Sequence, residues 1–540
     1  MLVAAAALAA PATAAGATGE LEQLPVPFGC LSPFNHGADC ATAKTLNGLR
    51  AVEVSPDGRH IYTASRAIAA PTRGIAAFSR DPLTGDPAQL ADPNGCITSD
   101  GSAGVCIDGT GVVAEGINDV ALSPDGRFLY AASFDSEAVY SFRRNRTTGV
   151  LTQLTAPDGP GCIAAAALAG CTVPASGAAK LFDVSQLVVA PDGANVYAIS
   201  LNGGVVSFER DEATGGLTFQ SGANRCISDT GAGPCVDGRG LAGPRALLMD
   251  ASGRRLYVAA GGGGDAVAIL DRSLATGRLT QATNRSGCVS DTGNGGECAD
   301  GVGLDGPVDL ALSPDGRFLH VAAFTNAALS SFAVARSSGH LDQLPAPRGC
   351  IRDVGAGPIA GCVNELRQAG TISAVEVSPD GESLYLISAL DDAILALDRN
   401  PRNGAVEQLP GEAGCIADPE NPFAGCAEAE GLDHVGSGDL AVPPGGDSLY
   451  HASEQDGALA SFDREVRCAG KPVTLFGTVG RDRIRGTGGP DVIATFGGAD
   501  VLRGRGGKDR LCGGAQADKL RGGPGRDRLL GGPGRDDERQ

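Results

Sequence analysis

Residues Val120–Ser133, VALSPDGRFLYAAS, decide the fold of this chain. The apolar segment Val120–Leu122 predicts one β-strand, and the aromatic and apolar segment Phe128–Ala131 predicts the strand that returns beside it. Between them, Pro124–Gly126 has the composition of a tight turn: proline fixes φ, aspartate bonds back to the backbone and glycine tolerates a positive φ. The stretch therefore predicts a β-hairpin.

The same hairpin recurs along the chain at a nearly constant spacing. When the residue before the turn is the marker, seven copies lie at positions 55, 123, 190, 250, 313, 378 and 443. An alternating strand such as 138–142 and a fourth strand such as 150–154 follow each hairpin. Seven units of four short antiparallel strands at a nearly fixed period predict an all-β fold, a seven-bladed β-propeller.

Both ends of the repeat region indicate a closed ring. The last unit stops after its third strand, Ala458–Phe462. The first unit begins with Gly19–Leu24 (GELEQL), which matches the fourth strand Gly339–Leu344 (GHLDQL) of another unit. We therefore expect the N-terminal segment to supply the outer strand of blade seven, because this exchange removes an open sheet edge from the ring.

Fourteen of the 16 cysteines are periodic, with one closely spaced pair in each unit. The spacing within a pair does not fit a CxxC metal or redox site. We predict seven local disulfides, each adding about 2–3 kcal/mol, and hence an oxidising compartment; free thiols are the alternative. The predicted pairs are Cys30/Cys40, Cys96/Cys106, Cys162/Cys171, Cys226/Cys235, Cys288/Cys298, Cys350/Cys362 and Cys415/Cys426. A disulfide between Cys468 and Cys512 is a further hypothesis.

The N-terminus and the charge distribution restrict location and partners. Residues 1–19, MLVAAAALAAPATAAGATG, resemble a signal peptide and predict export; a disordered Ala-rich leader is the alternative. No stretch approaches the roughly 18–20 apolar residues of a membrane span. Residues 472–540 carry 13 Lys and Arg against 9 Asp and Glu, a net charge of +4, so residues 1–471 carry −24 of the total −20. An acidic body argues against a nucleic-acid partner.

From Gly477 onward the sequence follows a nine-residue period. Aspartates lie at 482, 491, 500, 509, 518, 527 and 536, and an apolar residue follows two positions after the first six. This pattern resembles the haemolysin-type, or RTX, nonapeptide repeat GGxGxDxUx, in six full copies and a seventh partial one. The resemblance implies a parallel β-roll in which six-residue turns alternate with three-residue strands.

The resemblance also implies Ca²⁺ as the cofactor, because carboxylates and turn carbonyls are hard oxygen ligands. Alternate copies would face the same side, with Asp482, Asp500, Asp518 and Asp536 in one row and Asp491, Asp509 and Asp527 in the other. Thr478, Thr487 and Gln516 depart from the motif, and many variable positions hold Arg or Lys. These cations should weaken the sites toward the ~10⁻⁴–10⁻³ M range. A disordered Gly/Arg-rich tail is the alternative.

The hairpins and the TGxLTQL outer strands resemble lactonase-type and YVTN-type propellers over about residues 20–465. These signals are structural, so the resemblance implies a fold and transfers no catalytic residue.

Polar side chains at the starts of the innermost strands are candidates for binding or catalysis at a channel mouth; a solvated rim with ion pairs is the alternative. The candidates are Arg50, Asp119, Arg245, Asp309 and Asp439, accompanied by Asn118, Glu53 and Glu376. The six histidines lack HxH or HExxH spacing, which disfavours zinc catalysis.

Together these patterns divide the chain into a signal peptide-like leader (1–19), a propeller (20–467) and a calcium-binding roll (468–540). They predict a secreted or cell-surface protein whose repeats bind Ca²⁺ and fold outside the cell. The propeller is predicted to bind an extracellular polymer, a glycan or a cell-surface ligand. A secreted lactone or ester hydrolase that uses the channel residues is the main alternative, and a cell-wall structural protein is another; whether the protein is an enzyme stays open.

Overall fold

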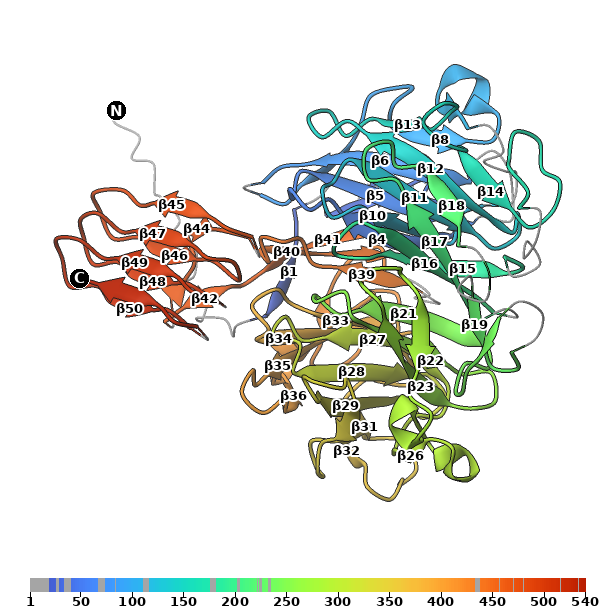
Figure 1. Cartoon of the computed structure of the whole chain (residues 1–540). Coiled ribbons are helices and arrows are strands. Elements are labelled where there is room, and N and C mark those ends of the chain that lie inside the picture. Colours follow the sequence, from blue (N-terminus) through green and yellow to red (C-terminus); the bar gives the residue numbers. More distant parts are fainter. Residues whose placement is uncertain are drawn as a thin grey trace.

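The computed structural model of this chain consists of a ring of β-sheets and a smaller β-roll beside it, as Figure 1 shows. Seven sheets form the ring, and two parallel four-stranded sheets form the roll. The structure describes residues 19–25, 29–33, 40–66, 73–82, 84–109, 116–174, 181–201, 204–220, 222, 226–231, 235–432, 438–455, 457–469, 471–478, 480–514, 516–532 and 534–540. The predicted leader therefore lies outside the described residues, apart from Gly19.

The seven blades share one order of strands from the channel outward. The innermost strands are β4 (Leu49–Val54), β10 (Asp119–Leu122), β15 (Val184–Val189), β21 (Pro244–Met249), β27 (Pro307–Leu312), β33 (Ile372–Val377) and β39 (Asp439–Ala441). The second strands are β5 (His60–Ser65), β11 (Phe128–Ser133), β16 (Asn195–Ser200), β22 (Arg255–Ala260), β28 (Phe318–Ala323), β34 (Ser383–Ser388) and β40 (Ser448–Ala452). The third strands are β6 (Gly74–Arg80), β12 (Ala138–Arg144), β17 (Gly204–Arg210), β23 (Ala266–Arg272), β29 (Ala328–Val334), β35 (Ala393–Arg399) and β41 (Leu459–Arg464).

The outer part of each blade is more elaborate than the single fourth strand expected from the sequence. Two short strands pair with each third strand: β7 (Pro87–Gln89) and β8 (Cys96–Thr98), β13 (Leu151–Gln153) and β14 (Cys162–Ala164), β18 (Leu217–Phe219) and β19 (Cys226–Ser228), β24 (Leu279–Gln281) and β25 (Cys288–Ser290), β30 (Leu341–Gln343) and β31 (Cys350–Asp353), β36 (Val406–Gln408) and β37 (Cys415–Ala417), and β1 (Leu21–Gln23) and β2 (Cys30–Ser32). An outermost parallel strand follows in six blades: β9 (Ile107–Asp108), β20 (Val236–Asp237), β26 (Ala299–Asp300), β32 (Val363–Leu366), β38 (Ala427–Glu428) and β3 (Ala41–Thr42). Short 3-10 helices are η1 (Gly101–Gly104), η4 (Arg285–Gly287), η5 (Gly293–Gly296) and η6 (Gly411–Gly414).

A glycine explains why the fourth strand is split in two. Between β7 and β8 the chain leaves the sheet after Leu90 and returns at Gly95, where a Cβ atom would lie 2.2 Å from the Leu90 carbonyl oxygen. Only glycine permits this close approach. Both ends of the excursion still bond to Ala77 of the third strand, at 2.9 and 3.0 Å. The cysteine pairs consequently lie on and beside short outer strands and not in free loops.

The N-terminal segment closes the ring. Strand β1 pairs antiparallel with β41 of the last unit, with Leu21 opposite Arg464 and Gln23 opposite Phe462. Strand β2 continues the same pairing through Cys30 and Ala460. Blade seven is therefore built from both ends of the repeat region, so separation of its two parts would break a sheet as well as a packing contact.

Apolar side chains of adjacent blades form one buried cluster at each of the seven junctions. A polar contact is repeated beside these clusters. Arg144 of blade two donates from Nε to the Tyr62 hydroxyl of blade one at 2.9 Å, and that hydroxyl donates to the Gly149 carbonyl at 2.6 Å. Equivalent pairs are Arg80–Tyr450, Arg210–Tyr130, Arg272–Tyr197 and Arg464–Tyr385. The blades are thus joined by apolar packing and by buried, charge-assisted hydrogen bonds.

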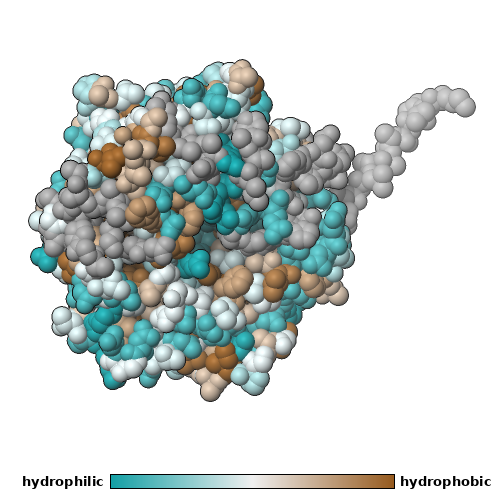
Figure 2. All heavy atoms as spheres, turned by 90° about the vertical axis from the view of Figure 1, so that its right-hand side faces the viewer, coloured by the Kyte–Doolittle hydropathy of each residue, from teal (hydrophilic) through white to brown (hydrophobic). Residues whose placement is uncertain are grey.

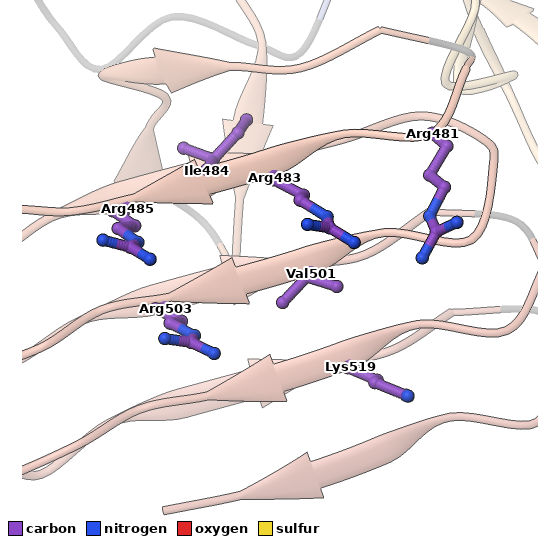
Figure 3. Close-up of a pocket in the computed structure, with 7 residues that line it drawn as sticks. All are labelled: Arg481, Arg483, Ile484, Arg485, Val501, Arg503 and Lys519. Carbon is purple, nitrogen blue, oxygen red and sulfur yellow. The ribbon is translucent and has the colours of Figure 1, made fainter.

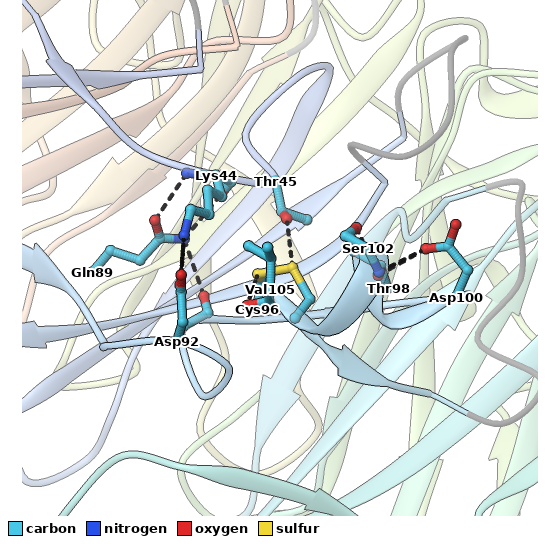
Figure 4. Close-up of a disulfide and its surroundings, with 12 residues drawn as sticks. Lys44, Thr45, Gln89, Asp92, Cys96, Thr98, Asp100, Ser102 and Val105 are labelled. Carbon is cyan, nitrogen blue, oxygen red and sulfur yellow. Dashed lines mark hydrogen bonds and ion pairs between the residues drawn. A yellow bond between two sulfur atoms is a disulfide. The ribbon is translucent and has the colours of Figure 1, made fainter.

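All seven predicted local disulfides are present, and Cys468 bonds to Cys512 as hypothesised. Figure 4 shows the surroundings of the Cys96–Cys106 bond. Nearby, the Gln89 side chain accepts a hydrogen bond from the backbone of Lys44 at 2.8 Å and donates one back at 2.9 Å. The same two-way clamp joins Gln23 to Glu430, Gln281 to Arg239 and Gln343 to Val302. The glutamine of the TQL pattern therefore holds neighbouring units together.

The roll follows the short hairpin β42 (Arg467–Cys468) and β43 (Lys471–Pro472). One parallel sheet contains β44 (Leu475–Phe476), β46 (Val492–Ala494), β48 (Arg510–Cys512) and β50 (Arg528–Leu530). The other contains β45 (Arg483–Arg485), β47 (Val501–Arg503), β49 (Lys519–Arg521) and β51 (Asp537–Arg539). Ile493, Leu502, Leu511 and Leu520 fill the space between the sheets. The seventh copy, expected to be partial, completes a turn and a strand with Glu538 in place of the apolar residue.

A separate apolar cluster, which includes Val466, Cys468 and Phe496, joins the roll to the ring. Phe496 lies against the turn of the seventh blade, since a Cβ on Gly446 would come within 3.1 Å of its ring. No helix in the described part of the chain has the length and hydropathy that a membrane crossing requires.

Candidate metal centre and the propeller channel

The aspartates of the roll link successive turns on the same side, with 18 positions of sequence from one aspartate to the next. In each row the Oδ1 atom of one aspartate accepts a hydrogen bond from the backbone N–H of the aspartate one full turn earlier. The bonds run from Asp482 to Asp500, from Asp491 to Asp509, from Asp500 to Asp518, from Asp509 to Asp527 and from Asp518 to Asp536, at 2.7 to 3.0 Å. The structure therefore places the predicted ligands in the two rows that alternate copies imply.

The second carboxylate oxygen differs among these aspartates. In Asp500, Asp509, Asp518 and Asp527 the Oδ2 atom is buried and has no hydrogen-bond partner among the described residues. A buried carboxylate oxygen without a partner is costly. Burial, together with neighbouring Asp500 and Asp536, accordingly raises the pKa of Asp518 to about 7. Burial is also the main cause that raises the pKa values of Asp500 and Asp509. A bound cation would remove this penalty.

Backbone carbonyl oxygens converge on the same places. A Cβ atom on Gly504 would lie 2.2 Å from Asp509 Oδ2 and 2.8 Å from the Gly522 carbonyl oxygen. The glycine one turn earlier, Gly486, has the same environment, with Asp491 Oδ2 at 2.5 Å and the Gly504 carbonyl at 2.7 Å from the hypothetical Cβ. The glycines thus leave space beside oxygen ligands that come from two successive turns.

In the first two aspartates the Oδ2 atom already has hydrogen-bond partners. Asp482 Oδ2 accepts hydrogen bonds from the backbone N–H and the hydroxyl of Thr478, at 2.5 and 3.0 Å. Asp491 Oδ2 does the same with Thr487, at 2.7 and 3.1 Å. The threonines that interrupt the motif therefore occupy the oxygens that a cation would use. Asp536, at the other end of its row, is half-buried.

The donor set fits Ca²⁺ when side chains and carbonyls are counted together. No group of three or more His, Cys, Asp or Glu side chains in the described ranges has an arrangement suited to a metal. Ca²⁺ takes six to eight oxygen ligands, including backbone carbonyls. The aspartates with free Oδ2 atoms and the carbonyls of the adjacent glycines would supply such oxygens between turns.

The candidate residues of the propeller meet at one end of the central channel. Arg50, Asp119, Arg245, Asp309 and Asp439 all line a cavity of about 150 Å³, together with Asn118, Ser185 and Gln186. Figure 2 shows the face of the ring turned away from the roll, with hydrophilic surface gathered around a hollow near its centre. The sequence thus identified residues from five different blades that share one cavity.

The carboxylates of this cavity bond to the backbone of the next blade. Asp309 Oδ2 accepts a hydrogen bond from Val375 N at 2.8 Å, while its Oδ1 accepts one from the adjacent Leu310 N at 2.8 Å. Asp439 joins Val52 and Leu440 in the same way. The next-blade bond also forms from Asp119 to Leu187 and from Gln186 to Leu247. These side chains therefore connect inner strands at four of the seven junctions.

Five carboxyl groups influence one another in this channel. Burial and the negative charge of Asp439 raise the pKa of Glu53 to about 8, and the same two causes contribute to raising the pKa of Asp309 to about 7. Burial raises the pKa of Asp439 to about 6 and that of Asp119 well above its usual value. The pKa of Glu376 is also raised by burial and by its acidic neighbours. Burial in the channel therefore raises the pKa of all five carboxyl groups above their usual values.

The two candidate arginines have different environments. Arg50 forms an ion pair with Glu454 of the seventh blade. Burial lowers the pKa of Arg50, and the charge of Glu454 opposes that shift. Arg245 is exposed at the start of β21. Of these two, Arg245 is the one that presents its charge to solvent.

Two family models match parts of the chain. The RTX calcium-binding nonapeptide repeat model, which spans four copies, matches residues 476–511 and 504–537. The WD domain, G-beta repeat model matches residues 109–138, which include β10 and β11. The fold and these repeats define a seven-bladed β-propeller that carries an RTX-type calcium-binding roll. The matches cover less than half of the chain, so they identify its modules and not a family for the whole.

Solved structures with a similar fold belong to proteins of different kinds. The periplasmic gluconolactonase of Pseudomonas aeruginosa is 19% identical over 66% of this chain and 83% of its own, with a TM-score of 0.42. Hydrazine synthase of Kuenenia stuttgartiensis is 14% identical over 79% and 98%, with a TM-score of 0.45. The β-propeller domain of Cps50 (Swd1) from Myceliophteria thermophila is 13% identical over 77% and 97%, with a TM-score of 0.43. No curated protein matches the chain in sequence. At these identities and TM-scores, the similarities carry no information about the activity of this chain.

Sequence reasoning missed two features of these sites. Gln186 occupies the same position as Asp119 and Asp309 relative to the turn marker, and its equivalent bond to the next blade was not anticipated. The contrast between aspartates with threonine partners and aspartates without them was also missed. Its signal was present, since Thr478 and Thr487 lie four residues before Asp482 and Asp491.

Proposed function

We propose that this chain is an exported calcium-binding protein whose β-roll is ordered by Ca²⁺ outside the cell and whose propeller is a binding or adhesion module. The observation that carries the proposal is the set of four buried, unpartnered Oδ2 atoms of Asp500, Asp509, Asp518 and Asp527. Ca²⁺ between turns would satisfy these oxygens, and its binding free energy would favour the folded roll. Eight disulfides support an oxidising location.

The construction of the propeller supports a rigid binding surface. Disulfides link the outer strands, and glutamine side chains of these strands bond to neighbouring blades. Buried arginines of the third strands also bond to neighbouring blades, closer to the channel. A scaffold of this kind presents its loops to a ligand with little loss of conformational entropy on binding. An extracellular polymer, a glycan or a cell-surface molecule would be the partner of this surface.

The alternative of a lactone or ester hydrolase has no observation that favours it. Asp119, Asp309 and Asp439 each use a carboxylate oxygen to bond the backbone of the next blade. A general base needs a carboxylate whose free oxygen reaches a substrate proton. These aspartates therefore have a structural role that already accounts for their positions.

A calcium titration of the full-length protein tests the proposal. We expect hydrogen exchange in residues 480–540 to be fast in chelator at neutral pH and slow in millimolar Ca²⁺, while the propeller stays protected in both conditions. Mg²⁺ at the same concentration is the control, because it favours octahedral sites that retain water. Equal protection of the roll with and without Ca²⁺ would contradict the proposal.

A further inference from the structure

One sheet of the roll has a strongly basic outer face. The odd-numbered repeats form the sheet β45, β47, β49 and β51, in which Ile484, Leu502 and Leu520 point toward the core. The residues on either side of each inward residue point outward. The position after it is arginine in every strand of this sheet: Arg485, Arg503, Arg521 and Arg539. In the other sheet the same position holds Phe476, Ala494, Cys512 and Leu530.

The arginines form a continuous column. Arg485 lies opposite Arg503, Arg503 opposite Arg521, and Arg521 opposite Arg539. Neighbouring strands are about 4.8 Å apart, and like charges that face one another across strands are destabilising. The column therefore reduces the stability of the roll. A ligand that carries regularly spaced negative charges would reverse this effect.

Among the described residues, an acidic side chain pairs with the column only at its C-terminal end. Asp537 forms ion pairs with Arg521 at 2.7 Å and with Arg539 at 3.0 Å. Toward the other end, the cationic side chains have no ion-pair or hydrogen-bond partner among the described residues; they are those of Arg481, Arg483, Arg485, Arg503 and Lys519. They line a cavity of about 300 Å³ together with Ile484 and Val501, and Figure 3 shows how these side chains lie. This group is called the basic face below.

We propose that the basic face binds a linear anionic polysaccharide, a polymer with carboxylate or sulfate groups along its length. Guanidinium groups bind such anions with paired, charge-assisted hydrogen bonds. The spacing between strands is close to the length of one sugar residue in an extended polymer, so successive arginines would meet successive sugars. The proposal adds to the proposed function a second surface, with a defined partner chemistry, on the calcium-binding module.

Other polyanions fit the basic face less well. Single-stranded nucleic acids are bound with aromatic side chains on which bases stack, and none of the described residues that line this cavity is aromatic. Surface-active segments insert aromatic and long apolar side chains into a lipid interface, whereas Ile484 and Val501 are the only apolar residues among the described ones that line this cavity. A row of arginines with no aromatic residue among the described lining residues therefore favours an extended, hydrophilic polymer.

Binding of dextran sulfate to the full-length protein in millimolar Ca²⁺ tests the inference, with uncharged dextran as the matched probe. We expect affinity for dextran sulfate only, decreasing as salt rises. The double substitution Arg485→Ser and Arg503→Ser should weaken binding by about tenfold or more. The control Arg526→Ser and Arg528→Ser removes the same charge from a turn and from the opposite sheet, and should change affinity less than about twofold.

Several results would overturn the inference. These are no binding of dextran sulfate, equal binding of dextran, equal losses in both double variants, or tighter binding of oligothymidylate or phosphatidylglycerol vesicles than of dextran sulfate. Hydrogen exchange with and without Ca²⁺ is measured on each variant. A roll that orders with Ca²⁺ but ignores dextran sulfate would refute this inference alone, whereas a roll indifferent to Ca²⁺ would refute the proposed function.

Discussion

Arg144 donates a hydrogen bond from Nη2 to Oδ1 of Asp57 at 2.9 Å, across 87 residues of chain. Asp57 belongs to the Pro-Asp-Gly turn of the first blade, and Arg144 ends the third strand of the second. The same turn aspartate accepts a hydrogen bond from the Ser55 hydroxyl at 2.6 Å. The residue that shapes the repeated hairpin therefore also connects it to its neighbour.

Loss of this arginine should destabilise the ring. The side chain of Arg144 is fully buried, so Arg144→Leu leaves Asp57 and the Tyr62 hydroxyl without their charged partner. We expect the free energy of unfolding to fall by about 3 kcal/mol. The adjacent Arg143 pairs with Asp158 at the surface, so Arg143→Leu should cost about 1 kcal/mol or less. Urea denaturation of both variants measures the difference, and similar losses would contradict this role for the buried pair.

The channel aspartates should affect stability. Asp309→Ala removes the acceptor of the Val375 backbone N–H, so we expect a loss of about 1–3 kcal/mol in unfolding free energy. Arg245→Ala changes an exposed residue of the same cavity and should alter stability by less than about 0.5 kcal/mol. Thermal unfolding checks both values. Unchanged stability in Asp309→Ala would contradict the proposed structural role of its hydrogen bond to the next blade.

Calcium affinity should depend on which aspartate is replaced. Asp518→Asn removes negative charge from a site with a free Oδ2, so the Ca²⁺ concentration at half-ordering of the roll should rise by about tenfold. In Asp482→Asn the rise should be under about twofold, because Thr478 already occupies the equivalent oxygen. Calcium titrations monitored by hydrogen exchange compare the two, and equal shifts would show that the threonine contacts are displaced by the ion.

The metal-free roll should become more stable in acid. Burial and nearby carboxylates raise the pKa of Asp518 in the folded roll to about 7, above the value of about 3.9 expected for an unfolded chain. The folded state therefore binds more protons, so the contribution to stability is complete below pH ~4 and is lost as the pH rises through about 7. In chelator, protection of residues 480–540 from exchange should be greater at pH 5 than at pH 8. Asp518→Asn should reduce this difference, and greater protection at pH 8 would contradict the assignment.

The repeats were accessible to sequence analysis because they depend on local chemistry. The Pro-Asp-Gly turns, the strands around them and the long period of the hairpins predicted the seven blades, and the nine-residue period predicted the roll. The local cysteine pairs could also be predicted, since both partners of each pair lie close together in the sequence, within one outer segment. Four strands per blade was an underestimate, because the close approach of Gly95 to Leu90 has no signal in strand propensity.

The sequence by itself determined the number of blades, the closure by the N-terminal strand and the two rows of roll aspartates, because each follows from a period that the chain repeats. Only the tertiary structure decided what individual polar groups do. In the folded chain, channel aspartates bond neighbouring blades, and four arginines align on one face of the roll. Two roll aspartates have threonine partners, whereas four others have a buried oxygen without a hydrogen-bond partner among the described residues. These outcomes depend on contacts between segments that lie far apart in the sequence, and a linear pattern does not show which groups such contacts satisfy.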